Sequence, residues 1–174
     1  MSFCNTFRLR LETHYNFSMK NYKRLIETPI GTLIAITDGV AIRVLDFADD
    51  TVEIESSEHP LLLQLSNELN EYFDGDRMSF TVPLAPDGTP FQQHVWEVLR
   101  AIPYGETISY AQEALLFGNP KATRAVANAN GKNPIAILIP CHRVIASNGS
   151  LGGYSGGLWR KEFLLALEQK GLSF

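Results

Sequence analysis

Ile139-Pro140-Cys141-His142-Arg143-Val144 joins an apolar part of the chain to a polar one. The five residues 135–139 that lead into it are all aliphatic, and a short run of this kind predicts a buried, strand-like segment. Pro140 ends regular pairing because its nitrogen carries no hydrogen to donate. We therefore expect Cys141 at the exit of a rigid buried element, where a thiol is both held in place and reachable from outside.

Cys141 is the candidate nucleophile of this stretch. Most lone cysteines are inert, small apolar side chains, so the thiol by itself indicates little. His142 and Arg143 follow it directly, and nearby cations stabilise a thiolate over a thiol. The pattern favours a reactive cysteine and predicts a lowered pKa for its thiol.

Upstream of the cysteine, capping residues delimit helices. Thr89 caps a helix over residues 91–99, which ends before Pro103. Phe91 and Trp96 are expected in the core of this part of the chain.

Two shorter helices follow. Ser109 caps the first, from Tyr110 to Phe117, and Gly118 closes it. The second runs from Lys121 to about Asn130, and two short helices joined by a tight glycine-containing turn are typical of a helix-turn-helix. A last helix is expected over residues 158–169.

The second helix of this pair is unusually slim. Alanines recur along it at positions 122, 125, 127 and 129. A slim helix fits the narrow minor groove of DNA, whereas a bulky one reads base edges in the major groove. Tight packing of the alanines on their own domain explains them equally well.

The first half of the chain predicts a small α+β unit over residues 21–82. Alternating β-formers indicate strands at 22–27, 33–37 and 40–47, with Asp38-Gly39 as a hairpin turn. Residues 60–73 have helical periodicity, and 79–82 allow one more strand. Residues 83–90, with three prolines, read as a linker to a mostly helical unit over residues 91–174. Residues 1–20 are expected to be a disordered extension.

Charge is distributed unevenly between the two halves. Residues 1–89 contain 7 Lys and Arg against 14 Asp and Glu, whereas residues 90–174 contain 8 against 5. No acidic residue lies between Glu113 and Glu162. Counterion release depends on the local face that meets the phosphates, so the net charge of -4 does not exclude DNA as a partner of the second half.

Composition excludes several other classes. No apolar run approaches the roughly 20 residues that span a bilayer. The two cysteines, Cys4 and Cys141, form no disulfide framework. A reducing cytoplasm is the expected compartment, or the nucleus in a eukaryote.

The stretch 139–144 resembles the active-site signature of the O6-alkylguanine-DNA alkyltransferases. The flanks match as well: Gly118 to Val126, Asn128 to Pro134, Asn148-Gly149, Gly153 to Leu158 and Lys161 to Glu168. The resemblance is close over about 89–171 and looser over about 26–80. It implies a ribonuclease-H-like first domain and a helix-turn-helix, winged-helix-like second domain.

The resemblance also implies the activity. Members of this family repair DNA by a single irreversible transfer of the alkyl group from O6-alkylguanine, and in some cases O4-alkylthymine, to their own cysteine. It implies double-stranded DNA bound through the minor groove and a monomer, and nothing in the sequence itself suggests a cofactor or a metal.

Residue roles carry over by position. The catalytic set is Cys141, His142, Glu168, Tyr110 and Asn133. In this family the histidine reaches the cysteine through a water, the glutamate fixes the histidine tautomer and favours its charged form, and the tyrosine donates a proton to the guanine ring. The implied DNA contacts are Arg124, which replaces the flipped base, together with Tyr110, Lys121, Ala125, Ala129, Lys132 and Arg143. The implied walls of the guanine pocket are Tyr154, Ser155, Gly152 and Gly156.

Two other functions stay open at this point. A non-catalytic binder of alkylguanine lesions has the same fold, but relatives of that kind replace the cysteine with tryptophan, and this chain retains Cys141. A cysteine hydrolase is disfavoured because successive residues of an extended segment point to opposite sides, which keeps His142 away from a direct bond to Cys141. Cys4, His14 and His59 lack the spacing of zinc ligands.

Overall fold

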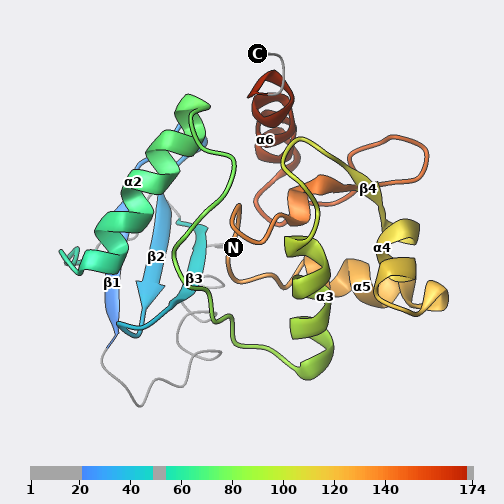
Figure 1. The fold of residues 1–174 in the computed structure, drawn as a ribbon, viewed down its shortest axis with the longest axis horizontal. Helices are drawn as coiled ribbons and strands as arrows, with labels where there is room; N and C mark the ends of the chain where they lie inside the picture. Colours follow the sequence, from blue (N-terminus) through green and yellow to red (C-terminus); the bar gives the residue numbers. More distant parts are fainter. Residues whose placement is uncertain (1–20, 49–53, 172–174) are drawn as a thin grey trace, which may run out of the picture.

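The computed structural model describes residues 21–48 and 54–171, so the expected extension over residues 1–20 lies outside the described residues. The described part confirms the α+β class, with an antiparallel sheet in the first half and helices in the second (Figure 1). Within it, no helix is both long and apolar enough to cross a membrane.

The first half is a three-stranded sheet packed against one helix. The strands β1 (Tyr22–Ile26), β2 (Leu33–Thr37) and β3 (Ile42–Phe47) pair in that order, and both pairs are antiparallel. Asp38 closes the turn before β3, because its carboxylate accepts from the backbone nitrogens of Val40 and Ala41. The helix α2 (Pro60–Asp74) buries its apolar stripe on the sheet and ends at Gly75, whose φ is 87°.

The outer edge of β3, on the side away from β2, forms hydrogen bonds with the segment that leads to the cysteine. Leu45 donates its backbone N–H to the carbonyl of Pro134 at 2.9 Å, and Ala136 donates to the carbonyl of Leu45 at 2.7 Å. Further along the same edge, Ile42 bonds in the same way to Pro83 and Ala85. The expected strand over residues 79–82 does not form. Instead, Leu84 forms an isolated β-bridge with Ile42.

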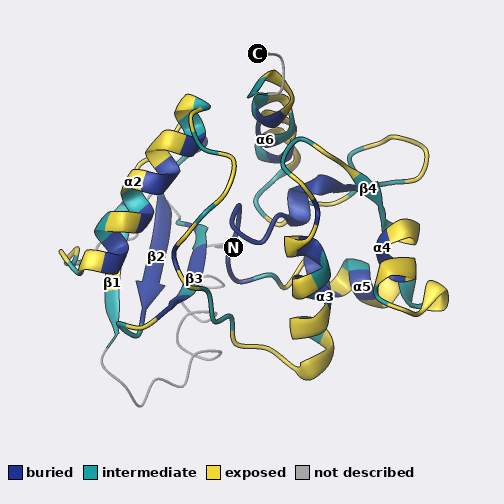
Figure 2. Ribbon diagram, viewed as in Figure 1, coloured by how far each residue is buried: buried dark blue, intermediate teal, exposed yellow. Residues whose placement is uncertain are grey.

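The apolar run 135–139 is buried, as expected, but it is not a strand. Figure 2 shows it in dark blue between the two halves of the molecule. Only Ile135 pairs with β3, after which the chain turns and Ile139 donates its N–H to the carbonyl of Ile135 at 3.1 Å. Ile137 has a φ of 70°, a conformation rare for a β-branched residue. An unbroken aliphatic run indicates that a segment is buried, but it does not distinguish a strand from a turn, because tertiary contacts determine that choice.

The second half consists of helices and one small parallel strand pair. Its elements are α3 (Pro90–Arg100), β4 (Ile108–Ser109), α4 (Tyr110–Leu116), η1 (Pro120–Ala122), α5 (Thr123–Asn130), η2 (Cys141–Arg143), β5 (Val144–Ile145) and α6 (Leu158–Gly171). Thr89 and Ser109 form capping boxes with the glutamines three residues later. Trp96 lies in the core and donates its indole N–H to the carbonyl of Ala129, which ties α3 to α5. Phe91, expected in the core, is instead 37% exposed and packs edge-on against the ring of Phe117.

A buried acid joins the two helices of the helix-turn-helix. Glu113 in α4 is fully buried, and its carboxyl accepts a hydrogen bond of 2.8 Å from the amide of Asn130 in α5. Its other oxygen and the Asn130 amide oxygen have no hydrogen-bond partner among the described residues. Burial raises the pKa of Glu113 to about 7, although the Asn130 bond lowers it in part.

Glu113 predicts a pH-dependent stability. Folding raises the pKa of Glu113, so the protonated carboxyl favours the folded state. This contribution to the free energy of unfolding is full below the unfolded pKa of 4.5 and is lost as the pH rises through 7. We expect Glu113→Gln to remove on the order of 3 kcal/mol of this pH dependence and to be more stable than the natural chain at pH 8. Urea denaturation at pH 5 and pH 8 measures it, with the exposed Glu106→Gln as the control. An equal shift at both pH values would contradict the assignment.

Candidate active site

Cys141 begins the short helix η2 and is 7% exposed. Asn133 clamps it: the side-chain amide donates to the sulfur at 3.3 Å and to the carbonyl of Ile139 at 2.8 Å. The Asn133 side-chain oxygen accepts from the backbone of Ile135 at 3.0 Å. One asparagine therefore closes the buried turn and fixes the sulfur at its end.

The Cys141 thiol is not acidic while it is buried and hydrogen-bonded to Asn133. Burial raises the pKa of Cys141 to about 11, and Asp46 adds to the rise, while the Asn133 hydrogen bond and the charge of Lys161 oppose it. The lowered pKa expected from His142 and Arg143 is wrong, because both side chains turn toward Glu168. Cys141 is therefore a protonated thiol at neutral pH until a base takes its proton.

Glu168 is the hub of a buried polar network. His142 contacts it through Nε2 at 2.8 Å, and Arg143 donates to its two oxygens at 2.9 and 3.0 Å. The hydroxyl of Tyr72 donates at 2.7 Å and the backbone N–H of Gly105 at 3.0 Å. Tyr72 comes from α2 and Glu168 from α6, so the network links the two halves of the molecule.

The network fixes the protonation states of its members. Burial would raise the pKa of Glu168, but the hydrogen bonds and charges of His142 and Arg143 outweigh it and hold this pKa well below its usual range. Burial lowers the pKa of His142, so the ring is neutral at pH 7, while the hydrogen bond and charge of Glu168 act in the opposite direction and favour the charged form. An ionised carboxylate only accepts, and Nε2 therefore carries the ring proton. Nδ1, which has no partner among the described residues, is left as a free base.

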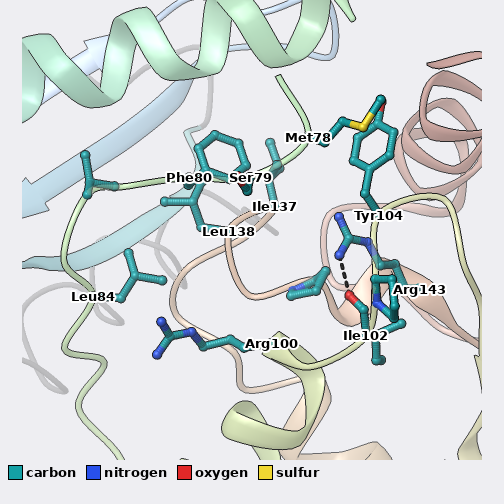
Figure 3. Close-up of a pocket in the computed structure, with 13 residues that line it drawn as sticks. Met78, Ser79, Phe80, Leu84, Arg100, Ile102, Tyr104, Ile137, Leu138 and Arg143 are labelled. Atoms are coloured by element: carbon teal, nitrogen blue, oxygen red, sulfur yellow. Dashed lines mark hydrogen bonds between the residues drawn. The ribbon is translucent and has the colours of Figure 1, made fainter. Parts of the chain in front are cut away.

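Arg143 is not a DNA contact. Its guanidinium is buried against Glu168, and it also donates to the carbonyl of Ile102 at 2.7 Å, the dashed line in Figure 3. The pocket drawn there has a volume of about 270 Å³ and lies between residues 78–84 and the turn before the cysteine. Pro140 and Arg143 line this pocket, whereas Cys141 does not, so it is distinct from the expected guanine site.

Of the expected guanine-pocket residues, Gly152 lies against the ring of Tyr110, and Gly156 lies against the rings of Phe47 and Tyr154. Burial raises the pKa values of Tyr110 and Tyr154, and a negative charge on Cys141 would raise both further. A Cβ on Gly152, whose φ is 69°, would stand 2.9 Å from the Tyr110 ring, and one on Gly156 would stand 2.5 Å from Phe47. These two positions need glycine because rings occupy the space beside them. Ser155 is exposed between them.

The basic face of the helix-turn-helix is the set of its expected DNA contacts that are exposed. Lys121, Arg124, Ala125 and Lys132 are exposed. Ala129 is 3% exposed and packs under Trp96, which corrects its place among the DNA contacts. Ala125 is exposed and Ala129 packs against the domain, so the structure leaves open whether the alanines serve DNA binding or internal packing.

Two basic residues near the end of the chain do not belong to this face. Arg160 donates to the carbonyls of Ile30 and Gly156, and its guanidinium lies 4.3 Å from the centre of the Phe47 ring. Lys161 is fully buried. In the sequence, only the helical spacing of Lys161, three residues from Leu164 and seven from Glu168, indicates that it is buried together with these two residues of α6. Tyr72 is a second site residue that the sequence does not single out, because the helical periodicity of residues 60–73 predicts only that this side chain is buried.

The described residues contain no group of three or more His, Cys, Asp or Glu side chains placed to hold a metal ion. His59 instead caps α2, where its Nδ1 accepts from the backbone of Leu61 at 3.3 Å. Cys4 and His14 lie outside the described residues.

Two family models match consecutive parts of the chain. Residues 21–86 match the ribonuclease-like domain of 6-O-methylguanine DNA methyltransferase, and residues 90–170 match its DNA binding domain. A methylated-DNA–protein-cysteine methyltransferase of Methanosarcina acetivorans is 46% identical over 152 residues, covering 84% of this chain and 97% of the relative. The constitutive enzyme of Bacillus subtilis with the same name is 44% identical, over 86% of this chain and 96% of its own length.

Solved structures show the same likeness. The crystal structure of Mycobacterium tuberculosis OGT in complex with DNA superposes with a TM-score of 0.79 at 44% identity, covering 86% of this chain and 94% of that one. The structure of the O6-methylguanine methyltransferase of the same organism also has a TM-score of 0.79, at 43% identity, covering 87% of this chain and 94% of that one.

Proposed function

Because the chain belongs to the 6-O-methylguanine DNA methyltransferase family, we propose that it repairs DNA by moving the alkyl group of O6-alkylguanine onto Cys141. The transfer is irreversible and happens once per protein molecule. The observation that carries this proposal is the buried thiol, fixed by Asn133 and followed by a histidine whose free nitrogen is a base.

The thiol loses its proton during the reaction. The Glu168 carboxylate keeps the ring proton of His142 on Nε2, so Nδ1 can accept the thiol proton, through a bridging water. The imidazolium that forms is stabilised by the carboxylate 2.8 Å away. The Asn133 amide, at 3.3 Å, donates to the sulfur as its negative charge develops.

The sulfur then attacks the alkyl carbon. A carbon–sulfur bond forms, the bond from this carbon to O6 breaks, and the electron pair stays with the guanine. The Tyr110 hydroxyl passes a proton to the guanine ring, and the proton that the thiol gave up to His142 replaces it, so that no net proton is gained or lost. Tyr154, Ser155, Gly152 and Gly156 hold the base. The product is a thioether without a good leaving group, and for this reason the protein does not turn over.

The base must leave the stacked duplex to reach Cys141, at a cost of a few kcal/mol. In this proposal α5 enters the minor groove, Arg124 fills the gap left by the flipped base, and Ala125 allows close approach. Lys121 and Lys132 bind phosphates on either side.

Further properties belong to the same proposal. Residues 83–90 link a first domain, 21–82, to a second that begins at residue 91. The protein acts as a monomer in the cytoplasm, where a reducing environment keeps Cys141 free of disulfides. A non-catalytic lesion binder of the same fold is the alternative, and it would bind alkylated DNA without gaining mass.

Arg124→Ala tests the proposal, because it separates base flipping from chemistry. We expect it to slow repair of O6-methylguanine in duplex DNA on the order of 100-fold, the equivalent of a few kcal/mol. Free O6-benzylguanine needs no flipping, so its reaction with Cys141 should stay within about twofold. Both rates are followed by the mass gained on the Cys141 peptide.

Lys121→Ala is the matched control, since it removes one exposed charge from the same face. It should weaken DNA binding in a salt-dependent manner and leave the flipping step intact. Equal losses on both substrates for Arg124→Ala would assign it to the fold. No mass gain by the unaltered protein would favour the lesion binder.

A further inference from the structure

Arg160, in the first turn of α6, makes hydrogen bonds to both halves of the molecule. Its Nε donates to the carbonyl of Ile30 at 2.7 Å, and its Nη1 donates to the carbonyl of Gly156 at 2.6 Å. Ile30 lies in the turn between β1 and β2, whereas Gly156 lies in the loop that leads into α6. One guanidinium therefore ties the first half of the chain to this loop, which we call the pocket loop (residues 152–157) because it contains the expected walls of the guanine pocket.

Aromatic rings enclose the same guanidinium. Its central carbon lies 4.3 Å from the centre of the Phe47 ring, at the end of β3, and 4.7 Å from that of Trp159. A cation is attracted to the face of an aromatic ring, and more strongly where water is excluded. Phe47 also meets the ring of Tyr154 at an angle of 71°, with 6.4 Å between their centres. Phe47 thus contacts both the guanidinium and a wall of the pocket.

The backbone at both ends of this contact leaves no room for a larger residue. A Cβ on Gly156 would stand 2.5 Å from Phe47 and 3.0 Å from Tyr154, and one on Gly31 would stand 3.0 Å from Nη2 of Arg160. Close-packed groups transmit displacements to one another, so a shift of Arg160 or Phe47 moves the pocket loop.

We propose that Arg160 is a positioning residue for alkyl transfer, because it fastens the pocket loop to the first half of the molecule and so keeps the walls of the guanine pocket in place. The inference rests on the proposed function, in which Tyr154 and Ser155 hold the flipped base beside Cys141. Arg160 acts through the carbonyl of Gly156 and through Phe47, so it affects how firmly the base is held and leaves the charge state of the thiol alone.

The other basic residue beside the pocket loop does a different task. Lys161 donates to the carbonyls of Gly153 and Val144, which both belong to the second half of the chain. It therefore ties the loop to its own half. Through Arg160, in contrast, the sheet of the first half takes part in shaping the site.

The test compares Arg160→Gln and Arg160→Lys with the natural chain. Glutamine is too short to bridge the two carbonyls, and lysine keeps the charge but has a single ammonium in place of a planar fork of donors. Arg77→Gln is the matched control, since Arg77 is also partly exposed and donates to a backbone carbonyl, that of Ser79, but lies outside the pocket loop.

Four quantities are measured. They are the single-turnover transfer rate at saturating O6-methylguanine duplex DNA, the affinity for that DNA, the pH dependence of Cys141 labelling by iodoacetamide, and the hydrogen exchange of residues 152–157 followed by mass. Melting temperatures of all variants are recorded alongside them.

We expect both Arg160 variants to slow transfer by about 10-fold or more, because a loosely held base spends less time in the geometry of attack. Hydrogen exchange of the pocket loop becomes faster, DNA affinity stays within about twofold, and the pH curve of iodoacetamide labelling is not shifted. Phe47→Leu acts in the same direction. Combined with Arg160→Gln it slows transfer by less than the product of the two single effects, because both substitutions remove one shared contact.

Normal transfer and normal loop exchange in Arg160 variants that only melt at a lower temperature would make Arg160 a tie between the two halves and overturn the inference. A shifted pH curve would also overturn it, since Arg160 would then act on the thiol. If the natural chain gains no methyl group on Cys141, the proposed function fails, whereas hydrogen exchange still decides whether Arg160 fastens the loop.

Discussion

We expect Cys141→Ser to abolish alkyl transfer and to leave binding to O6-methylguanine DNA within about twofold of that of the natural chain. A hydroxyl is a far weaker nucleophile than a thiol, and the neutral His142 is too weak a base to ionise it, so we expect a loss of at least ~1,000-fold. The substitution is nearly isosteric, and the Asn133 amide keeps an acceptor at the same place.

The natural chain sets the reference for this comparison. It should gain one methyl group, about 14 Da, on Cys141, and the amount of repaired lesion should stop at one equivalent of protein. Intact-mass measurement and a titration of lesion against protein give both quantities. Continued repair beyond one equivalent would exclude a thioether product, and residual transfer by Cys141→Ser would place the acceptor elsewhere.

Glu168→Gln has the second largest expected effect, since it removes the charge at the centre of the buried network. The Arg143 guanidinium then loses its carboxylate, and breaking a buried pair in this way costs about 3–5 kcal/mol of stability. The amide of glutamine also presents donors to groups that themselves donate, including the Tyr72 hydroxyl. Transfer from DNA should slow on the order of 100-fold, because His142 loses both its tautomer partner and the stabilisation of its imidazolium.

The pH dependence separates the two roles of Glu168. Its pKa is depressed on folding, so its stabilisation is present above the unfolded pKa of 4.5 and is lost as the pH falls toward the depressed value. Glu168→Gln should therefore lack this part of the acid destabilisation, and its transfer rate should follow a pH profile shifted upward. Glu162→Gln, an exposed carboxylate of the same helix, is the control. A normal pH–rate profile in a destabilised Glu168→Gln protein would leave Glu168 with a purely structural role.

Local rules were sufficient for most of the secondary structure. The capping residues Thr89 and Ser109, the Asp38-Gly39 turn and the apolar stripe of α2 act within a few residues of the chain, so their consequences can be predicted from the sequence. The cysteine stretch could likewise be located from the local pattern, because an aliphatic run that ends in proline indicates a buried segment after which regular backbone pairing stops.

Long-range contacts decided the rest. Whether residues 135–139 become a strand or a turn depends on the edge of β3, almost 90 positions earlier in the chain, and on the Asn133 clamp. The charge state of a side chain depends in the same way on distant partners. Arg143 and Lys161 look alike in sequence, as basic residues in a basic region, yet folding pairs one with the Glu168 carboxylate and the other with the backbone carbonyls of Val144 and Gly153. Sequence determined which residues carry the chemistry, and only the tertiary structure decided which of their charges are exposed to DNA and which are buried, because desolvation and pairing arise from residues far apart in the chain.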